Sequence, residues 1–340
     1  MKESALVVAP GRGSYSKTTM GILQNREGTR LQQLHEYRKK QQRLSPIEID
    51  ALPRFQSSKH LAGEEASLLT AACSIADFDD IDQEKYDIVG VCGNSMGHYT
   101  ALILSEVLSL TDGATLIDTM GEYQRGNIIG GQQVYPICDE DWKIVPQREK
   151  AVEKALSNIE DLHLSIDLGF QKIIAGTKEA LSQAKDYLPS FEQSKRTFPI
   201  TLPMHSAFHT PLLQSSSQRA QNDLQDIIWS HAKYPLIDGL GHVSYPWVTP
   251  PQRIKEYTLG AQVVATYQFR LMIQHAISLL CPERIILLGP GSNLGGAIAQ
   301  SIIDIGWYGI HSKQDFLSRQ EKDPILLSMG RPEQRSKVIR

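Results

Sequence analysis

Residues 87–97 read DIVGVCGNSMG, an apolar run of buried-strand character that ends in a Gly-x-Ser-x-Gly pentapeptide. Helical periodicity follows directly after it. A serine at a sharp strand-to-helix turn is held in strained backbone geometry, and it needs small neighbours so that the strand and the helix can approach each other. Gly93 and Gly97 supply them. The stretch therefore predicts a nucleophile, Ser95, at a helix start where free N–H groups favour a developing oxyanion.

Other parts of the chain also show strands that end at glycine-rich turns. Residues 6–9 are apolar and lead into PGRGS at 10–14, and residues 284–288 lead into Gly-Pro-Gly. Helical segments separate these strands, and the polar, basic segment 26–43 predicts an exposed helix. Because alternating strands and helices favour a parallel sheet, we predict an α/β fold with an α/β-hydrolase-like core and a mostly parallel sheet.

Residues 127–203 have a different pattern from the sequence on either side. Strand-like and helix-like segments occur there in the order strand, helix, strand, strand, helix, strand, which is typical of a split βαβ arrangement. We predict an inserted, ferredoxin-like small subdomain at 127–203 within a discontinuous large domain of residues 1–126 and 204–314. Residues 315–340 are charged and contain proline, so we expect them to form a peripheral C-terminal tail.

The composition excludes several classes of protein. The 340 residues include 35 Lys and Arg against 38 Asp and Glu, for a formal net charge of −3. A protein that binds nucleic acid through bulk electrostatics would show a basic excess, so we expect no nucleic-acid partner. The four cysteines are scattered, without a C-x-x-C pair or histidines at metal-ligand spacing, which argues against a disulfide framework and against a metal site.

The sequence also bears on location. The N-terminal apolar run is too short for a secretory signal, and no stretch approaches the ~20 apolar residues of a membrane span. With unpatterned cysteines, these features predict a cytoplasmic protein without a membrane partner.

A serine hydroxyl is a weak nucleophile near neutral pH and needs a base within hydrogen-bond reach. Of the ten histidines, His205 and His209 lie in LPMHSAFHTPL (residues 202–212), where the chain returns from the small subdomain to the large domain. The residues alone leave both histidines as candidates. They also leave open that Ser95 is an incidental serine in a tight turn.

Four segments of the chain resemble one family, the malonyl-CoA:acyl carrier protein transacylases and the acyltransferase domains of polyketide synthases. GNSMGHYTAL at 93–102 is similar to the family's GHSxGEYxAL elbow, and AFHTPL at 207–212 to its AFHSPL segment. PGRGS at 10–14 resembles the PGQGS loop, and LGPG at 288–291 the VGPG turn. The similarity extends over roughly residues 5–305, with the motifs in the family's order.

Carried over position by position, the resemblance implies that Ser95 is the acyl-accepting nucleophile and His209 the general base, with His205 a neighbour. It implies an oxyanion hole formed by the backbone N–H groups of Met96 and Arg12.

In this family a backbone carbonyl orients the second nitrogen of the catalytic histidine. The segment here that resembles that position contains Asp238 and Gly239. The resemblance therefore implies that Asp238 orients His209, either through its carbonyl or as the third member of a triad.

The resemblance also implies a reaction. Ser95 attacks an acyl-CoA thioester, CoA leaves, and the phosphopantetheine thiol of an acyl carrier protein attacks the acyl-enzyme, in fatty acid or polyketide biosynthesis. The expected partners are acyl-CoA and an acyl carrier protein, no metal or other cofactor is required, and we expect a monomer.

The chain departs from the family at positions expected to line the acyl pocket. Met120 stands where the family has the arginine that binds the free carboxylate of malonyl, and methionine cannot bind a carboxylate. Asn94, His98 and Arg12 replace a histidine, a glutamate and a glutamine. Phe208, beside the base, either narrows this pocket or belongs to the core.

Two hypotheses on the acyl group follow. In the first, malonyl remains the substrate and Arg12 supplies the relocated cation. In the second, Met120 makes the wall apolar and the pocket takes a neutral acyl chain. Two further alternatives are a hydrolase that releases acyl groups from carrier proteins with the same Ser95 and His209 pair, and an inactive scaffold that forms no adduct on Ser95.

Overall fold

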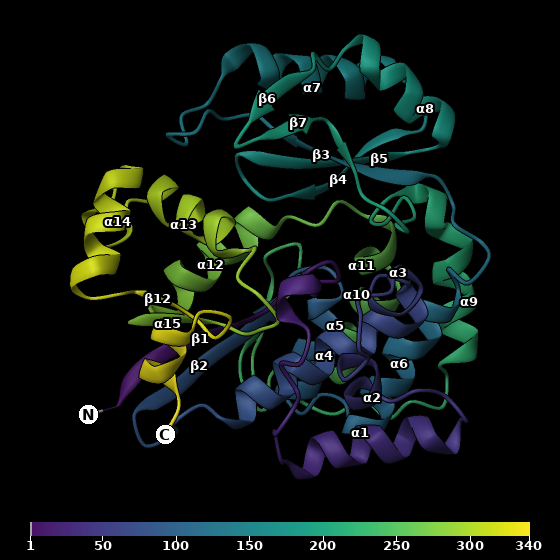
Figure 1. Ribbon diagram of the computed structural model, residues 1–340, viewed down its shortest axis with the longest axis vertical. Coiled ribbons are helices and arrows are strands. Elements are labelled where there is room, and N and C mark those ends of the chain that lie inside the picture. Colours follow the sequence, from purple (N-terminus) through teal and green to yellow (C-terminus); the bar gives the residue numbers. More distant parts are fainter. Residues whose placement is uncertain (1) are drawn as a thin grey trace.

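Six strands form the central sheet of the larger part of the molecule, in the order β10-β9-β2-β1-β11-β12. Figure 1 labels β1, β2 and β12 of this sheet, in the lower part of the view. The computed structural model describes residues 2–340. Within this described chain, only the β9–β10 pairing of the central sheet is antiparallel, so the predicted α/β fold with a mostly parallel sheet is confirmed. The strands are β1 (Glu3–Ala9), β2 (Tyr86–Gly93), β9 (Leu236–Ile237), β10 (Val243–Ser244), β11 (Arg284–Leu287) and β12 (Leu326–Ser328).

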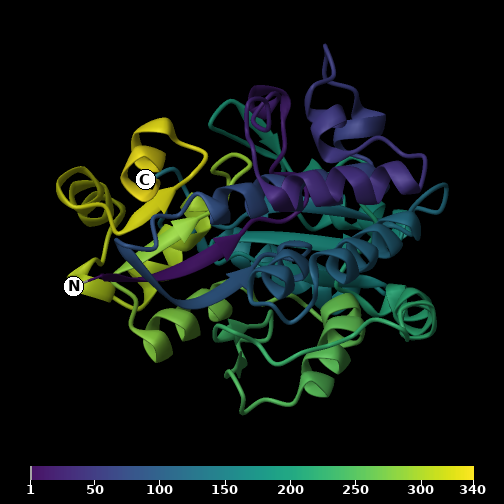
Figure 2. The same cartoon turned by 90° about the horizontal axis from the view of Figure 1, so that it is seen from below.

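Helices cover both faces of this sheet (Figure 2). They are α1 (Thr29–Lys40), α2 (Pro46–Asp50), α3 (Ser57–His60), α4 (Gly63–Asp79), α5 (Gly97–Leu104), α6 (Leu110–Glu122), α9 (Gln214–Asp223), α10 (Pro251–Leu259), α11 (Ala261–Val264), α12 (Phe269–Leu280), α13 (Gly295–Asp304), α14 (Lys313–Lys322) and α15 (Pro332–Val338). Successive side chains of a strand point to opposite faces, so Ala5, Val7 and Ala9 pack in one core with α4, α5 and α6. Leu6 and Val8 pack in the other core with α12 and α13. The central strand β1 is therefore buried on both faces.

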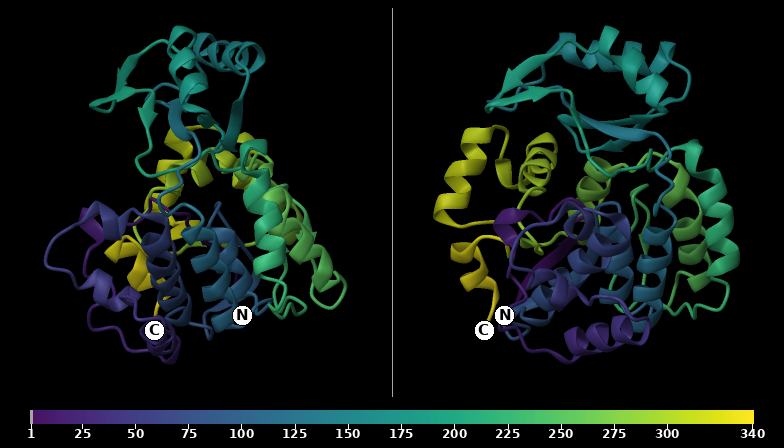
Figure 3. Two further views of the ribbon diagram at one scale, coloured as in Figure 1. Left: turned by 90° about the vertical axis from the view of Figure 1, so that its right-hand side faces the viewer. Right: turned by 45° about the vertical axis from the view of Figure 1, so that its right-hand side comes forward.

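A second, antiparallel sheet forms the smaller part, in the order β4-β5-β3-β8. Its elements along the chain are β3 (Gly131–Pro136), α7 (Pro146–Asn158), β4 (Leu162–Asp167), β5 (Gln171–Gly176), α8 (Lys178–Gln183) and β8 (Ile200–Thr201). The hairpin of β6 (Phe191–Gln193) and β7 (Arg196–Phe198), which the sequence did not predict, precedes β8. Helices α7 and α8 cover the outer face of this sheet, and the inner face is turned toward the larger part (Figure 3).

The C-terminal segment is part of the fold, so the prediction of a peripheral tail at residues 315–340 is wrong. β12 joins the edge of the central sheet in parallel with β11, and Ile325 to Leu327 are buried. The buried carboxylate of Asp77 on α4 pairs with Arg335 of α15 and, at 2.6 Å, with Arg26. A short apolar run within a charged segment was sufficient to form an edge strand.

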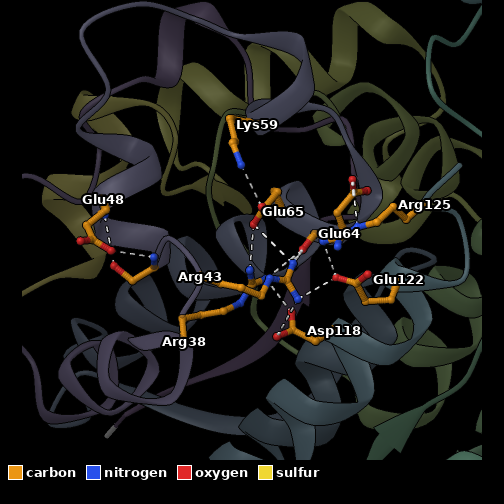
Figure 4. A network of polar contacts seen from close by, with 10 residues as sticks. Arg38, Arg43, Glu48, Lys59, Glu64, Glu65, Asp118, Glu122 and Arg125 are labelled. Atoms are coloured by element: carbon orange, nitrogen blue, oxygen red, sulfur yellow. Dashed lines mark hydrogen bonds and ion pairs between the residues drawn. The ribbon is translucent and has the colours of Figure 1, made fainter. Parts of the chain in front are cut away.

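The predicted exposed helix at 26–43 corresponds to α1, but Arg38 on it is fully buried. Its guanidinium lies 2.8 Å from a carboxylate oxygen of Glu65 on α4 and 2.6 Å from one of Asp118 on α6 (Figure 4). Arg43 adds an ion pair of 2.8 Å to Glu122. The helix packs on carboxylates of α4 and α6, and a buried charge is tolerated only when it is paired in this way.

Candidate active site

Ser95 lies at the sharp turn between β2 and α5, with a backbone φ of 55° in the left-handed region. The two flanking glycines are required by the close packing of the turn. A Cβ atom on Gly93 would lie 2.1 Å from the carbonyl oxygen of Gly97, and one on Gly97 would lie 2.3 Å from that of Ala9. The local geometry is therefore that of a nucleophile elbow.

The elbow places the Oγ atom of Ser95 2.7 Å from Nε2 of His209. The other ring nitrogen of His209, Nδ1, lies 2.7 Å from the carbonyl oxygen of Gln262. A carbonyl only accepts, so Nδ1 carries the proton and Nε2 of the neutral ring is free to accept the proton of the serine. Burial lowers the pKa of His209 to about 4, although the hydrogen bond to Gln262 acts in the opposite direction. The ring is therefore neutral near neutral pH.

The expectation that Asp238 orients His209 is wrong, because Gln262 fills that role through its carbonyl group. The Asp238 carboxylate instead accepts hydrogen bonds from the backbone N–H groups of Leu240 and His242 and so stabilises its own turn. The sequence carries no signal for Gln262, since every residue has a carbonyl group.

Gln262 contacts Ser95 as well as His209. Its side-chain Nε2 donates to the carbonyl oxygen of Ser95 at 2.9 Å. The ring of Tyr267 packs beside His209 with 5.2 Å between ring centroids, and its hydroxyl donates to the carbonyl of Gly93. Both residues thus connect the base to the elbow.

A cavity of about 370 Å³ opens over Ser95 and His209. Residues of both the larger and the smaller part of the molecule form its walls. Asn94, Met120 and Arg12, which the resemblance placed at the acyl pocket, line it. Phe208, for which the sequence left pocket and core open, also lines it. So do Met96 and His205. Within residues 2–340, the backbone N–H groups of Met96 and Arg12 donate no hydrogen bond to the protein.

His98, by contrast, does not line the cavity, and the prediction that it does is wrong. Its ring is fully buried behind the elbow, where Nε2 lies 3.0 Å from Oγ1 of Thr258 and the ring of Tyr257 packs edge-on at 5.1 Å. His98 and Tyr99 both lie in the first turn of α5, but they point in different directions, His98 into the core and Tyr99 to the cavity. Burial lowers the pKa of His98 to about 3, so it is a neutral core residue.

Arg12 places a cation in the cavity wall without a carboxylate beside it. Its guanidinium donates to the side-chain oxygen of Gln124 at 2.7 Å and to the carbonyl of Met204 at 2.9 Å, and it lies 5.1 Å from the ring centroid of Phe208. No carboxylate of the described residues lies within 4.0 Å of it. Burial lowers the pKa of Arg12 to about 10, with partial compensation from the charge of Glu64.

Metal ligands do not gather at this site. Among residues 2–340, no group of three or more His, Cys, Asp or Glu side chains could hold a metal ion. Over the same residues, no helix combines the length and apolar character needed to cross a membrane.

A serine and a histidine in contact at a strand-to-helix elbow of an α/β fold form an arrangement that is typical of nucleophilic catalysis. In sequence, the chain is 22% identical over 239 residues to the malonyl CoA-acyl carrier protein transacylase of Staphylococcus aureus, across 68% of this chain and 72% of that protein. It is 24% identical over 275 residues to a phenolphthiocerol synthesis type I polyketide synthase of Mycobacterium marinum, across 75% of this chain and only 12% of that protein. No family model matches the chain.

Solved structures show the same fold. The malonyl-CoA:ACP transacylase of a Synechocystis species superposes with a TM-score of 0.74 at 17% identity, across 99% of this chain and 100% of that one. A malonyl-transacylase in complex with a type II polyketide synthase acyl carrier protein gives a TM-score of 0.72 at 15% identity, across 99% of each chain. The chain thus resembles malonyl-CoA:acyl carrier protein transacylases and polyketide synthase acyltransferases in sequence and fold, and the resemblance noted from its motifs is confirmed.

Proposed function

We propose that this chain is an acyltransferase that moves an acyl group from CoA to the phosphopantetheine thiol of an acyl carrier protein, in fatty acid or polyketide biosynthesis. The observation that carries the proposal is the 2.7 Å contact between Ser95 and a neutral His209 at a strained elbow. The named activities of the similar proteins support the choice of donor and acceptor.

The reaction has two matched steps. Nε2 of His209 takes the hydroxyl proton while Oγ of Ser95 attacks the thioester carbonyl carbon, and the C–S bond then breaks as His209 returns the proton to the CoA sulfur. In the second step the carrier thiol gives its proton to His209 and attacks the ester carbon, and the C–Oγ bond then breaks as His209 returns that proton to Oγ of Ser95. The N–H groups of Met96 and Arg12 donate to the oxyanion in both steps. This mechanism requires no cofactor.

The acyl group in this proposal is malonyl or a similar carboxylated chain. The support comes from Arg12, a partly buried cation in a cavity where the family arginine is replaced by Met120, and no carboxylate of residues 2–340 forms an ion pair with it. A guanidinium has five N–H donors, and the two hydrogen bonds to Gln124 and Met204 leave others for a substrate carboxylate.

A neutral acyl group is the second candidate, and the apolar wall favours it. Met120 lies on that wall with Val134, Ile173 and Leu202 from the small subdomain. A hydrolase with the same pair differs only in that water takes the place of the carrier thiol. The small subdomain itself we infer to be ferredoxin-like, which is supported by its antiparallel order β4-β5-β3-β8.

A competition experiment tests the acyl assignment. The protein is incubated with equal concentrations of malonyl-, acetyl- and butyryl-CoA, and intact mass identifies the group on Ser95. Malonyl in clear excess supports the proposal that Arg12 binds the carboxylate of the acyl group. Acetyl or butyryl in excess supports the apolar pocket, and no adduct supports the inactive scaffold.

A further inference from the structure

A chain of hydrogen bonds runs from the catalytic loop through the small subdomain to His205 in the cavity wall. It begins at the carbonyl oxygen of Phe208, next to the base, which lies 2.8 Å from Oγ of Ser165 on β4. Oγ of Ser165 lies 2.6 Å from Nε2 of Gln132 on β3. The other end of that amide, Oε1 of Gln132, lies 2.8 Å from Nδ1 of His205. Ser165 and Gln132 are both buried.

The chemistry of each group sets the direction of every bond in this chain. The carbonyl of Phe208 only accepts, so the hydroxyl proton of Ser165 points to it. Ser165 then accepts from the amide nitrogen of Gln132, which leaves the amide oxygen as the acceptor toward His205. Nδ1 of His205 must therefore carry a proton.

The other nitrogen of His205 is thereby left as an acceptor. Burial and, secondly, the positive charge of Arg12 lower the pKa of His205 well below its usual value, so the ring is neutral. A neutral ring with a proton on Nδ1 has none on Nε2. Nε2 bonds to no other residue of the described chain and is not among its buried unpartnered atoms, so it is open to the cavity that His205 lines.

We propose that Nε2 of His205 accepts a hydrogen bond from an N–H or O–H group of the bound acyl-pantetheine thioester and so selects for substrates that carry a donor there. The inference rests on the proposed function and deepens it, because it names a second recognition group beside Arg12. Arg12 donates and His205 accepts, so the two residues recognise opposite polar groups of one substrate.

Two parts of such a thioester carry a donor, and matched probes separate them. The amide of the pantetheine arm is tested with malonyl and butyryl thioesters of N-acetylcysteamine. Each is compared with the matching thioester of a ketone analogue of N-acetylcysteamine, in which a CH2 group replaces the amide N–H. A donor in the acyl chain is tested by comparing β-hydroxybutyryl with butyryl on the ketone analogue. The quantity measured is the second-order rate constant for acylation of Ser95.

The wild-type protein should prefer the donor-bearing member of at least one pair by about five- to tenfold, the usual value of one neutral hydrogen bond. His205→Phe, which keeps a ring but has no acceptor, should lose that preference. Arg125→Gln, which changes a side chain outside the cavity, should retain it. Equal rates for both members of every pair in the wild type, or the same preference in His205→Phe, would overturn the proposal.

Nitrogen NMR of the histidine side chains gives a test that does not depend on a variant. The proposal requires a protonated Nδ1 and a bare Nε2 on His205 at neutral pH, and a doubly protonated ring or the opposite tautomer contradicts it. If Ser95 forms no acyl adduct at all, the proposed function fails. If the adduct forms without donor preference, only the role of His205 fails.

Discussion

Ser95 and His209 both have a positive φ, 55° and 57°, and their side chains meet at 2.7 Å. Backbone strain at both residues persists only when the surroundings hold it. Gln262 helps to fix both residues, because its carbonyl accepts a hydrogen bond from the ring of His209 and its side chain donates one to the carbonyl of Ser95. The geometry that the proposed reaction needs is therefore already present in the protein without substrate.

The pH dependence of acylation should reflect the buried base. His209 must be neutral to accept the serine proton, and burial lowers its pKa to about 4. The rate constant for acylation of Ser95 should therefore stay constant from about pH 8 to about pH 5 and fall tenfold per pH unit below about pH 4. Stopped-flow release of CoA measures it, and circular dichroism over the same range shows whether the protein stays folded. A midpoint near 6.5 would contradict the buried, neutral base.

The lowered pKa of His209 also predicts how the folding stability depends on pH. The unfolded chain binds a proton at His209 below about pH 6.5, whereas the folded protein does so only below about pH 4. Folding stability is therefore lost as the pH falls through this interval. His209→Gln, which does not titrate, should lose less stability between pH 7 and pH 5 in urea unfolding than the wild type. An equal loss in both proteins would show that His209 is not the titrating group.

Arg12→Gln should lower malonylation of Ser95 by about 10- to 100-fold and leave acetylation nearly unchanged. The substitution removes charge-assisted hydrogen bonds to the carboxylate, and the backbone N–H of residue 12 remains for the oxyanion. Arg125→Gln is the matched control, because Arg125 pairs with Glu122 and does not line the cavity. Equal losses for both acyl groups would show that Arg12 acts on the reaction in general and does not select a carboxylate.

Arg38→Met should destabilise the protein by about 3–5 kcal/mol, because it leaves the buried carboxylates of Glu65 and Asp118 without their main partner. Arg219→Met removes an exposed arginine that pairs with Asp223 within α9, and it should change stability by less than about 1 kcal/mol. Urea unfolding of both variants measures the difference. Similar small effects would mean that Arg43 and Lys59 compensate for the loss.

Arg335→Gln tests whether the C-terminal segment is bound to the core. It leaves Asp77, whose side chain is fully buried, with Arg26 and the N–H of Gly289 as partners, so we expect a loss of about 1–3 kcal/mol in urea unfolding. Arg331→Gln, at an exposed position of the same segment, should have no effect. No change in either variant would mean that the segment adds little stability.

The elbow and the parallel sheet could be predicted because each depends on local patterns, whereas the choice of His209 over His205 as the base came from the family resemblance. A strand, two glycines and a serine specify a turn, and the segment around His209 is conspicuous once a base is sought. The orienting carbonyl of Gln262 could not be predicted, because its role depends on the position of the backbone and not on its side chain. The burial of Arg38 likewise depends on carboxylates 27 and 80 residues away along the chain.

The orientation of His98 shows the same limit. Its neighbours in the motif all contribute to the elbow, yet the first turn of α5 directs this side chain into the core. Motif position predicts which residues are near the nucleophile, whereas the helix decides which of them face the cavity.

The lifetime of the acyl group on Ser95 distinguishes a transferase from a hydrolase and from an inactive scaffold. The enzyme is acylated with malonyl-CoA, freed of excess CoA thioester, and followed by intact mass with and without the phosphopantetheine form of an acyl carrier protein, with Ser95→Ala as control. A transferase should keep the adduct for minutes in buffer and pass it to the carrier within seconds, with no adduct on the variant. Loss of the adduct to water at the same rate with and without carrier, or an adduct that persists on Ser95→Ala, would contradict acyl transfer through Ser95.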